Sequence, residues 1–200
     1  MTDATTGPIG PYERRTVSVQ PWDPRVVDVA ARVIALIQER RPELRVEHIG
    51  STAVPGLPGK GIVDLGTEAD PSDIPAITQA MYELGFGPQP GPDPWPASRP
   101  MHVGSYDLDG REYRIHLHVH PRGGDFPHDL QFRDALRADP ALAEGYARLK
   151  AAIAAGSEGP LDGVVYQGAK GGWILETYDR LGIPRPDSPT SLAAGEETRP

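Results

Sequence analysis

Apolar residues recur along this chain with two different spacings, and each spacing predicts a different kind of element. Within residues 24–41, and again within residues 70–84, apolar side chains fall three or four positions apart, which is the spacing of a helix with one buried face. An Asp-Pro pair stands at the start of both segments, and such a pair suits the cap and the first turn of a helix. We expect three further helices, over residues 127–137, 140–155 and 165–181.

Shorter apolar segments predict strands. Residues 45–49 and 62–65 are expected to be strands on either side of a loop rich in Gly and Pro. Residues 101–108 and 112–120 predict a hairpin around Asp109-Gly110, a pair typical of tight turns. Residues 85–100 form a Pro- and Gly-rich excursion that carries Trp95 and suits a lid or a partner contact.

The order of these elements and the composition together predict one α/β (α+β) domain. Strands come early and helices cluster late, as in a mixed sheet flanked by helices. Two hundred residues are enough for a single domain with a buried core. The chain ends, residues 1–16 and 184–200, are rich in residues that favour disorder. We therefore expect a domain over residues 17–183 between two disordered tails.

Charge and cysteine content exclude several functions. A net charge of −8 argues against broad binding to nucleic acid backbones, although it allows a local basic pocket for one anionic ligand. Without cysteine the chain has no disulfide, thiol nucleophile or zinc-thiolate site. No segment is predicted to act as a signal peptide or to span a bilayer. We expect a cytoplasmic protein that does not bind membranes.

Gly50-Ser51 and Asp64 are the first candidates for chemistry. A strand that ends in Gly-Ser presents backbone N–H groups and a hydroxyl, which can grip phosphate oxygens; an isolated Gly-Ser is more often an ordinary turn. Asp64 lies in an apolar strand, where a carboxylate is costly unless it is paired or bound to a metal. It could hold a divalent cation that bridges phosphates, or pair with Lys60 or an arginine. Lys60 itself is either a phosphate ligand or a solvated loop lysine.

Polar and apolar side chains alternate strictly from residue 114 to 120, so that they face opposite sides of a strand. The polar set is Arg114, His116, His118 and His120, and the apolar set is Ile115, Leu117 and Val119. Histidines on one face could bind a metal or contact a bound phosphate. The alternative is a solvent-facing strand, with His120 as its exposed end.

Two later segments offer positive charge. Arg133 and Arg137 lie one helical turn apart, where they could contact phosphate or pair with nearby carboxylates. Lys170 lies near the apolar side of the last predicted helix, pointing either into a pocket or out to solvent.

The motif HIGSTAVPGL at residues 48–57, with Lys60 and Asp64, closely resembles the signature of the GrpB family of predicted nucleotidyltransferases. The resemblance continues through residues 116–119, 132–137 and 146–150, and more weakly through 166–173. It thus covers about residues 17–181 in order. It implies a nucleotidyltransferase-like fold, a short mixed sheet flanked by helices, with Gly50-Ser51 and the Asp64 strand at the active edge. Family members also occur fused to dephospho-coenzyme A kinases, which points to nucleotide or coenzyme metabolism.

One departure from the superfamily pattern bears on the mechanism. The usual second carboxylate, two residues after Asp64, is replaced by Gly66, and the third carboxylate position falls on the His116/His118 strand. Glu68 and Asp70 lie too far along the chain to substitute. This departure leaves two expectations: one cation held by Asp64 and a histidine, or a site that binds nucleotide only.

These observations together predict a metal-dependent protein that transfers a nucleotidyl or phosphoryl group and takes a small-molecule nucleotide or another phosphorylated ligand. Asp64, His118 and Lys60 are the candidate catalytic residues, and Asp64, His116 and His118 the candidate ligands of a Mg²⁺ or Mn²⁺ ion. The predicted phosphate-binding residues are Gly50, Ser51, Thr52, Lys60, Arg133 and Lys170. Two alternatives are a binding module that has lost catalysis and, ranked last, a metal-dependent hydrolase that uses the histidine face.

Overall fold

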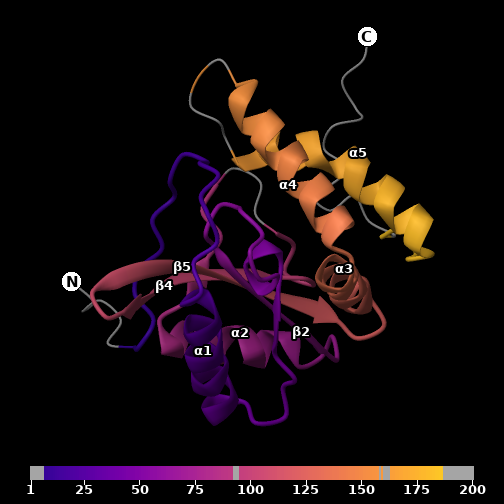
Figure 1. Ribbon diagram of the computed structural model, residues 1–200. Coiled ribbons are helices and arrows are strands. Elements are labelled where there is room, and N and C mark those ends of the chain that lie inside the picture. Colours follow the sequence, from indigo (N-terminus) through magenta and orange to yellow (C-terminus); the bar gives the residue numbers. More distant parts are fainter. Residues whose placement is uncertain (1–6, 92–94, 158, 160–162, 187–200) are drawn as a thin grey trace.

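A five-stranded mixed sheet organises the computed structural model, which describes residues 7–91, 95–157, 159 and 163–186 (Figure 1). The strands lie in the order β1-β2-β5-β4-β3. Only β2 and β5 run parallel, and the other neighbouring strands of this sheet pair antiparallel. Their bounds are β1 Glu47–Ile49, β2 Val63–Ala69, β3 Gly87–Pro88, β4 Met101–Leu108 and β5 Arg111–Pro121.

The helices match the sequence prediction closely. The first two are α1 (Val26–Arg40) and α2 (Ile74–Leu84), and a short 3-10 turn, η1 (Ser51–Ala53), follows β1. The last three are α3 (Phe126–Ala138), α4 (Pro140–Ala155) and α5 (Gly163–Leu181). The predicted fold class, a mixed sheet flanked by helices, is confirmed. The predicted excursion over residues 85–100 also contributes β3, which pairs with β4 at the edge of the sheet.

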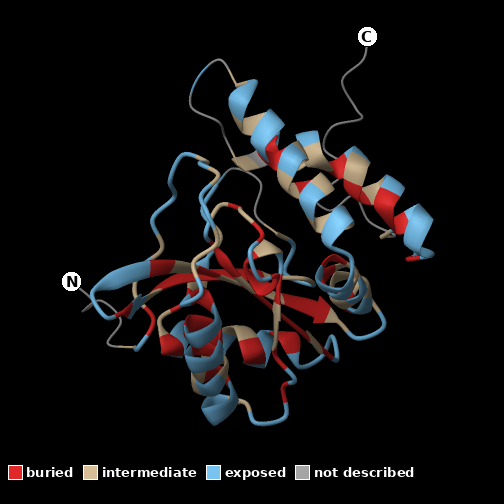
Figure 2. Cartoon of the chain, viewed as in Figure 1, coloured by how far each residue is buried: buried red, intermediate tan, exposed pale blue. Residues whose placement is uncertain are grey.

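The main core lies between one face of the sheet and the helices α1 and α2. The alternation predicted for β5 is confirmed, because Ile115, Leu117 and Val119 are each 0% exposed and belong to this core. The predicted stripe of α2 packs against them, and Figure 2 shows buried residues along the sheet and on the sides of α1 and α2 that face it. This packing turns the other face of β2 and β5 toward α3, α4 and α5.

A second, smaller apolar cluster joins the helices α3, α4 and α5, through residues such as Leu136 and Ile174, to Val54 and Leu57 of the loop after η1. Within it the rings of Tyr146 and Trp173 are stacked, with centroids 5.0 Å apart. Figure 1 shows these helices on the opposite side of the sheet from α1 and α2. The second face of the sheet therefore meets a separate helical layer.

Residues 7–17, which we call the N-terminal strap, differ from the expected disordered tail. Ile9 is 2% exposed and lies in the main core. Gly10 and Ser105 exchange two backbone hydrogen bonds of 2.8 and 2.9 Å, so the strap is tied to β4. Composition suggested disorder because Thr, Pro and Gly dominate the segment, but one buried Ile and one backbone bridge suffice to hold it. Residues 1–6 and 187–200 of the two predicted tails lie outside the described residues.

Membrane association was not expected from the sequence. Across the part of the chain that the structure describes, no helix combines the length and the apolar character needed to cross a bilayer.

The buried imidazole of His102 predicts that the protein loses stability in mild acid. His102, on the core face of β4, is 1% exposed, and its Nε2 lies 3.4 Å from the Thr78 hydroxyl. Burial lowers its pKa to about 4. From pH 6.5 down to 4 the unfolded chain takes up a proton on this residue that the folded protein does not, so the free energy of unfolding falls by roughly 3 kcal/mol over this window.

In urea titrations at pH 7 and pH 4.5, His102→Gln should therefore lose much less stability on acidification than the wild type. Thr78→Val removes the hydrogen-bond partner but keeps the imidazole, so it should retain the full pH dependence. Equal pH dependence in His102→Gln and the wild type would contradict the assignment.

Candidate functional site

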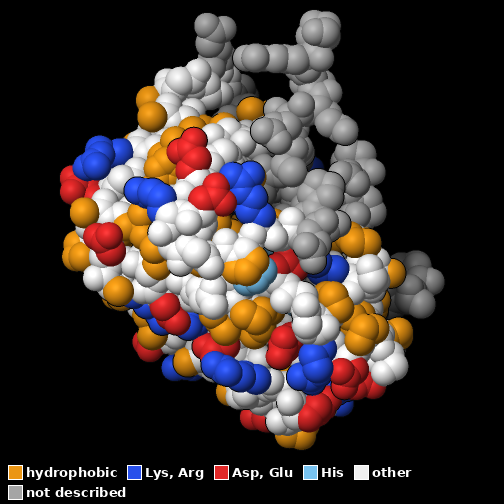
Figure 3. Space-filling view, turned by 90° about the vertical axis from the view of Figure 1, so that its right-hand side faces the viewer, with side chains coloured by type: hydrophobic (Ala, Val, Ile, Leu, Met, Phe, Trp, Pro, Cys, Tyr) orange, Lys and Arg blue, Asp and Glu red, His pale blue; other side chains and the backbone are white. Residues whose placement is uncertain are grey.

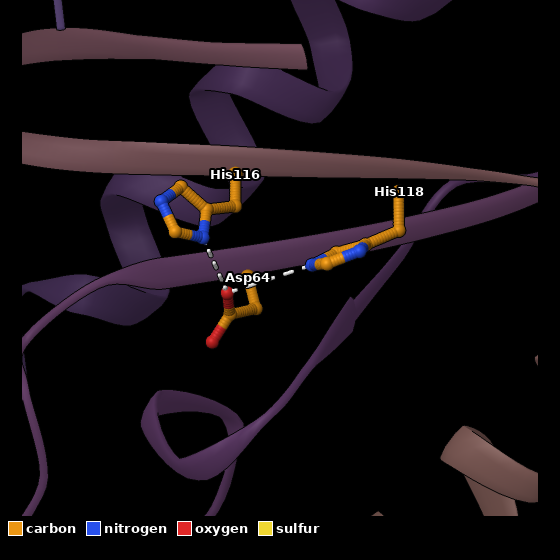
Figure 4. Close-up of side chains that lie close together, drawn as sticks. All are labelled: Asp64, His116 and His118. Carbon is orange, nitrogen blue, oxygen red and sulfur yellow. Dashed lines mark ion pairs between the residues drawn. The ribbon is translucent and has the colours of Figure 1, made fainter. Parts of the chain in front are cut away.

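The parallel register of β2 and β5 brings three predicted ligand residues together. Asp64 stands opposite His116, and Gly66 stands opposite His118. The Oδ1 atom of Asp64 lies 3.4 Å from Nδ1 of His116 and 3.8 Å from Nε2 of His118 (Figure 4). One ligand atom from each residue lies within 4.8 Å of the other two. The two histidines and the carboxylate predicted from the sequence thus form one cluster, on the sheet face away from α1 and α2.

The charge states of this cluster suit a divalent cation. Burial alone would raise the pKa of Asp64, but hydrogen bonding to His116 and His118 outweighs burial and lowers that pKa. Burial lowers the pKa of His116, although the Asp64 carboxylate opposes this. The pair is therefore an ionised carboxylate and a neutral imidazole at neutral pH, which are the forms that bind metals.

The donor set also bears on which ion fits. Mg²⁺ takes oxygen ligands almost exclusively, whereas imidazole nitrogen suits transition metals such as Mn²⁺, Fe²⁺ or Zn²⁺. One carboxylate and two imidazoles thus fit a transition metal better than Mg²⁺. The Nε2 atom of His116 lies 3.1 Å from the Tyr12 hydroxyl, which is the kind of outer contact that orients a metal-binding histidine.

Gly50 allows the loop after β1 to lie directly against Asp64. Its backbone has φ 69° and ψ −170°, a region that essentially only Gly occupies. A Cβ atom at this position would lie 2.5 Å from Oδ2 of Asp64. The Gly of the Gly-Ser pair is therefore required both by backbone conformation and by the closeness of the carboxylate.

Ser51 and Thr52 differ in where their hydroxyls lie. Ser51 lines the cavity described below, and Gly59 lies so close that a Cβ there would be 2.8 Å from its Oγ. The Thr52 side chain is buried, and its hydroxyl donates to the carbonyl of Ile62 at 2.9 Å and contacts Nε2 of His48 at 3.0 Å. Thr52 thus closes the loop, whereas Ser51 faces the cavity.

Gly66 occupies the position of the missing second carboxylate, and the structure gives a steric reason for it. A Cβ atom at Gly66 would lie 2.7 Å from the ring of Phe126 and 2.9 Å from Cδ1 of Ile49. An Asp or Glu here would displace packed apolar side chains. The cluster therefore has room for one carboxylate on β2.

Arg133, predicted to bind phosphate, is engaged by the protein itself. It is 8% exposed, its Nε donates to Asp134 at 2.8 Å, and its Nη1 donates to Glu47 and to the carbonyl of His48. Arg137 similarly donates to the carbonyl of Ala53 at 2.8 Å. Both arginines hold α3 against β1 and the loop after it.

A cavity of about 320 Å³ lies beside the cluster of Asp64, His116 and His118, between the sheet and the helices α4 and α5. The chain has 3 lysines against 17 arginines, and all of these lysines, Lys60, Lys150 and Lys170, line this cavity. The Nζ atoms of Lys60 and Lys170 each lie 5.4 Å from the ring centre of Tyr166. Figure 3 shows a histidine near the middle of one face of the molecule, between apolar and acidic side chains.

Lys150 and Lys170 are held in an environment that weakens their charge. Lys150 is 1% exposed, donates to the carbonyl of Pro58, and lies 4.5 Å from the ring centre of Tyr146. Burial lowers its pKa to about 7, and the charge of Lys170 adds to this effect. Burial also lowers the pKa of Lys170 to about 8, although Asp64 opposes the change. An anion in the cavity would restore full protonation of both.

His120 does not join the cluster of Asp64, His116 and His118, and the view of it as an exposed strand end is wrong. It is 0% exposed, with Nε2 3.4 Å from Asp129 and Nδ1 4.0 Å from Asp125. The chain turns back over it through the start of α3. Near His118 lies Trp95, the aromatic residue of the predicted excursion, with ring centres 5.4 Å apart; residues 92–94 of that excursion lie outside the described residues.

Sequence reasoning missed Lys150 and Tyr12 as site residues. Lys150 could have been found from the resemblance to the GrpB family, which covers residues 146–150. Tyr12 carried no such signal, because it lies in a segment whose composition suggests disorder.

The fold and the site define the class of the protein: an α/β domain with a mixed sheet flanked by helices, in which the Gly50-Ser51 turn lies against Asp64 on β2. The family model described as GrpB protein matches residues 16–180, so the chain belongs to the GrpB family.

Relatives and a solved structure agree with this assignment. The UPF0157 protein of Halalkalibacterium halodurans is 30% identical over 159 residues, which cover 77% of each chain. The UPF0157 protein of Deinococcus radiodurans is 35% identical over 115 residues, and this chain spans 56% of its length. The crystal structure of the conserved protein GrpB from Enterococcus faecalis is similar in fold, with a TM-score of 0.65, 22% identity, and coverage of 82% of this chain and 96% of that one.

The contact between Gly50 and Asp64 predicts an unusually costly substitution. Gly50→Ala should destabilise the protein through its positive φ, by about 1–2 kcal/mol, and by roughly 1–3 kcal/mol more because the new Cβ displaces the carboxylate. Gly61 also has a φ of 69°, but a Cβ atom there would meet no other atom within 4 Å, so Gly61→Ala should cost clearly less than Gly50→Ala. Urea denaturation of both variants tests this, and equal losses would mean that the Asp64 contact costs nothing.

Proposed function

We propose that the protein binds a small-molecule nucleotide, or another ligand with a polyphosphate group, through one divalent cation and transfers a nucleotidyl or phosphoryl group from it. One observation carries the proposal. The Asp64, His116 and His118 cluster, which suits a cation, and every lysine of the chain line the same cavity. A polyphosphate that binds together with a cation needs both a site for the cation and positive side chains around the phosphates.

The residues divide the work in a way that fits phosphoryl transfer, where positioning and charge neutralisation supply most of the catalysis. Asp64, His116 and His118 would hold the ion, preferably Mn²⁺ or a similar transition metal. When bound, the ion would neutralise phosphate oxygens and polarise the bond that breaks. Lys60, from the loop before β2, and Lys170, from α5, would neutralise the remaining phosphate charge, and Ser51 and the backbone at Gly50 would orient the phosphate group. In this proposal Arg133 acts indirectly, by holding β1 in place.

The size of the cavity and the net charge of the chain favour a small ligand. A volume of about 320 Å³ lies at the lower end of the range for small-molecule sites. The net charge of −8 disfavours a long polyanion outside the cavity. We therefore propose a nucleotide or a related coenzyme precursor as the partner, rather than a nucleic acid.

A metal-dependent hydrolase is the second candidate, because of one observation about the histidine face. Asp64, on the strand next to the histidine strand, supplies a carboxylate beside His116 and His118. Two histidines with one carboxylate form a common hydrolytic metal site. Water would then accept the phosphoryl or nucleotidyl group. Incubation with ATP and Mn²⁺, followed by analysis of products with and without candidate hydroxyl acceptors, separates transfer from hydrolysis.

The cation site predicts the effect of a single substitution on β2. Asp64→Asn keeps the size of the side chain but removes the charged ligand, so it should abolish both Mn²⁺ binding and turnover while the protein stays folded. Glu68→Gln is the matched control, since Glu68 lies on the same strand and faces Arg122 at 3.6 Å. Calorimetric titration of Mn²⁺ and product analysis with ATP measure the two effects. Unchanged Mn²⁺ affinity in Asp64→Asn would sink the cation assignment.

The lowered pKa values of the lysines predict how ligand binding depends on pH. Lys150 and Lys170 have pKa values of about 7 and about 8, and only their protonated forms attract phosphate. The affinity for ATP should thus fall as pH rises from 6.5 to 9. Lys170→Gln should weaken binding about tenfold at pH 6.5, as expected for the loss of one charge-assisted hydrogen bond, and should flatten the pH dependence.

Arg148→Gln is the control for this measurement. Arg148 lies on α4 near Lys150, but its side chain is 67% exposed and paired with Glu144. Its replacement should leave the affinity for ATP and the pH dependence unchanged, as measured by calorimetry. An affinity for ATP that does not change with pH in the wild type would contradict the lysine assignment.

A further inference from the structure

The N-terminal strap is seated in a socket that glycines create. A Cβ atom at Gly104 would lie 2.3 Å from Cγ2 of Ile9, and one at Gly85 would lie 2.1 Å from the Ile9 carbonyl oxygen. The backbone N–H of Ile9 donates to the carbonyl of Leu84 at 3.1 Å. Larger residues at these glycines would exclude the strap, so the strap can bind here only because both positions are glycine.

Because the strap is anchored in this way, Tyr12 lies against the cluster of Asp64, His116 and His118. Tyr12 follows two residues after the bridge between Gly10 and Ser105. Its hydroxyl lies 3.1 Å from Nε2 of His116, and the two ring centres are 5.3 Å apart. Tyr12 also lines the cavity. The Asp64 carboxylate faces Nδ1 of the same imidazole at 3.4 Å.

The two contacts of His116 determine which ring nitrogen can hold a cation. A neutral imidazole carries one proton, so a proton on Nε2 leaves the lone pair of Nδ1 free on the side of Asp64. A proton on Nε2 needs an acceptor, because the side chain of His116 is only 13% exposed and an unpaired buried N–H is costly. The Tyr12 oxygen is that acceptor.

We infer that Tyr12 is a positioning residue for the cation site, which fixes the orientation of His116 and the tautomer that leaves Nδ1 free to bind the ion. The inference rests on the proposed function, since it concerns the same cation. The match to the GrpB family model begins at residue 16, so the strap residue Tyr12 lies outside the part of the chain that this match covers.

The hydroxyl can serve the site with and without a cation. A tyrosine hydroxyl both donates and accepts. Without the ion, a proton on Nδ1 faces the Asp64 carboxylate, and Tyr12 donates to Nε2. If an ion were bound at Nδ1, the proton would reside on Nε2, and the Tyr12 oxygen would accept a hydrogen bond from this N–H. A phenylalanine at this position could do neither, although it would fill nearly the same volume.

The test compares Tyr12→Phe with the wild type in Mn²⁺ and Zn²⁺ binding. Loss of an outer partner of a metal-binding histidine typically lowers metal affinity about 10- to 100-fold, and we expect at least a tenfold loss for both ions. The thermal midpoint of the metal-free protein should stay close to that of the wild type. Correlation NMR of ¹⁵N-labelled histidine rings in the Zn²⁺ form should show the His116 proton on Nε2 in the wild type and a weakened or exchanging Nε2 proton in the variant.

Two further variants separate the hydroxyl from the strap. Tyr82→Phe removes a tyrosine hydroxyl on α2, beyond the opposite face of the sheet, and should leave metal affinity unchanged. Ile9→Ala loosens the anchor, so it should lower both stability and metal affinity. If the strap contributed only by packing, metal affinity would fall in Ile9→Ala and stay unchanged in Tyr12→Phe.

The outcomes distinguish this inference from the function on which it rests. If the wild type binds neither Mn²⁺ nor Zn²⁺, the cation site of the proposed function fails, and the role of Tyr12 fails with it. If the wild type binds these ions and Tyr12→Phe binds them equally, with the same His116 tautomer, the role of Tyr12 is overturned and the proposed function stands.

Discussion

The parallel pairing of β2 with β5 is the interaction on which the rest of the site depends. It sets Asp64 beside His116 and His118 on one face, while the opposite face of β5 is fully buried against α1 and α2. A shift of one residue in this register would exchange the two faces, so the same burial that stabilises the sheet also keeps the three polar groups together. Stability and chemistry are therefore coupled through one strand pair.

Two glycines near Asp64 are required by the space around it. Gly50 is close enough that any side chain would displace the carboxylate, and Gly66 leaves space for Phe126 and Ile49 rather than for a second acid. The site consequently concentrates its negative charge on one residue of β2. The lysines face this single charge across the cavity, and Lys170 is near enough for Asp64 to influence its pKa.

Local patterns in the sequence were sufficient to predict the helices and the hairpin, and the resemblance to the GrpB family pointed to the grouping of Asp64 with His116 and His118. Each of these depends on spacing within one element or on two neighbouring strands. The fates of Tyr12, Arg133 and His120 depend instead on contacts between distant segments. Arg133 donates hydrogen bonds to β1, and His120 is covered by α3. Neither contact can be predicted from the spacing of residues within one element. Tyr12 is ordered by a socket made of glycines far along the chain, so composition alone pointed the wrong way.

The position of the cavity between two separately packed layers has a mechanical consequence. The sheet contributes the acidic and histidine side, and the helices α4 and α5 contribute two of the three lysines. The sheet has one apolar cluster with α1 and α2, and the helices α3, α4 and α5 have another, which Val54 and Leu57 of the loop after η1 join. Like charges on Lys150 and Lys170 repel each other in the absence of a ligand. A polyphosphate lying between the layers would bind the sheet side through its cation and the lysines of α4 and α5 through its own charge, so it would hold the two layers together. The ligand would then contribute to the cohesion of the molecule, and its departure would loosen the joint between the layers.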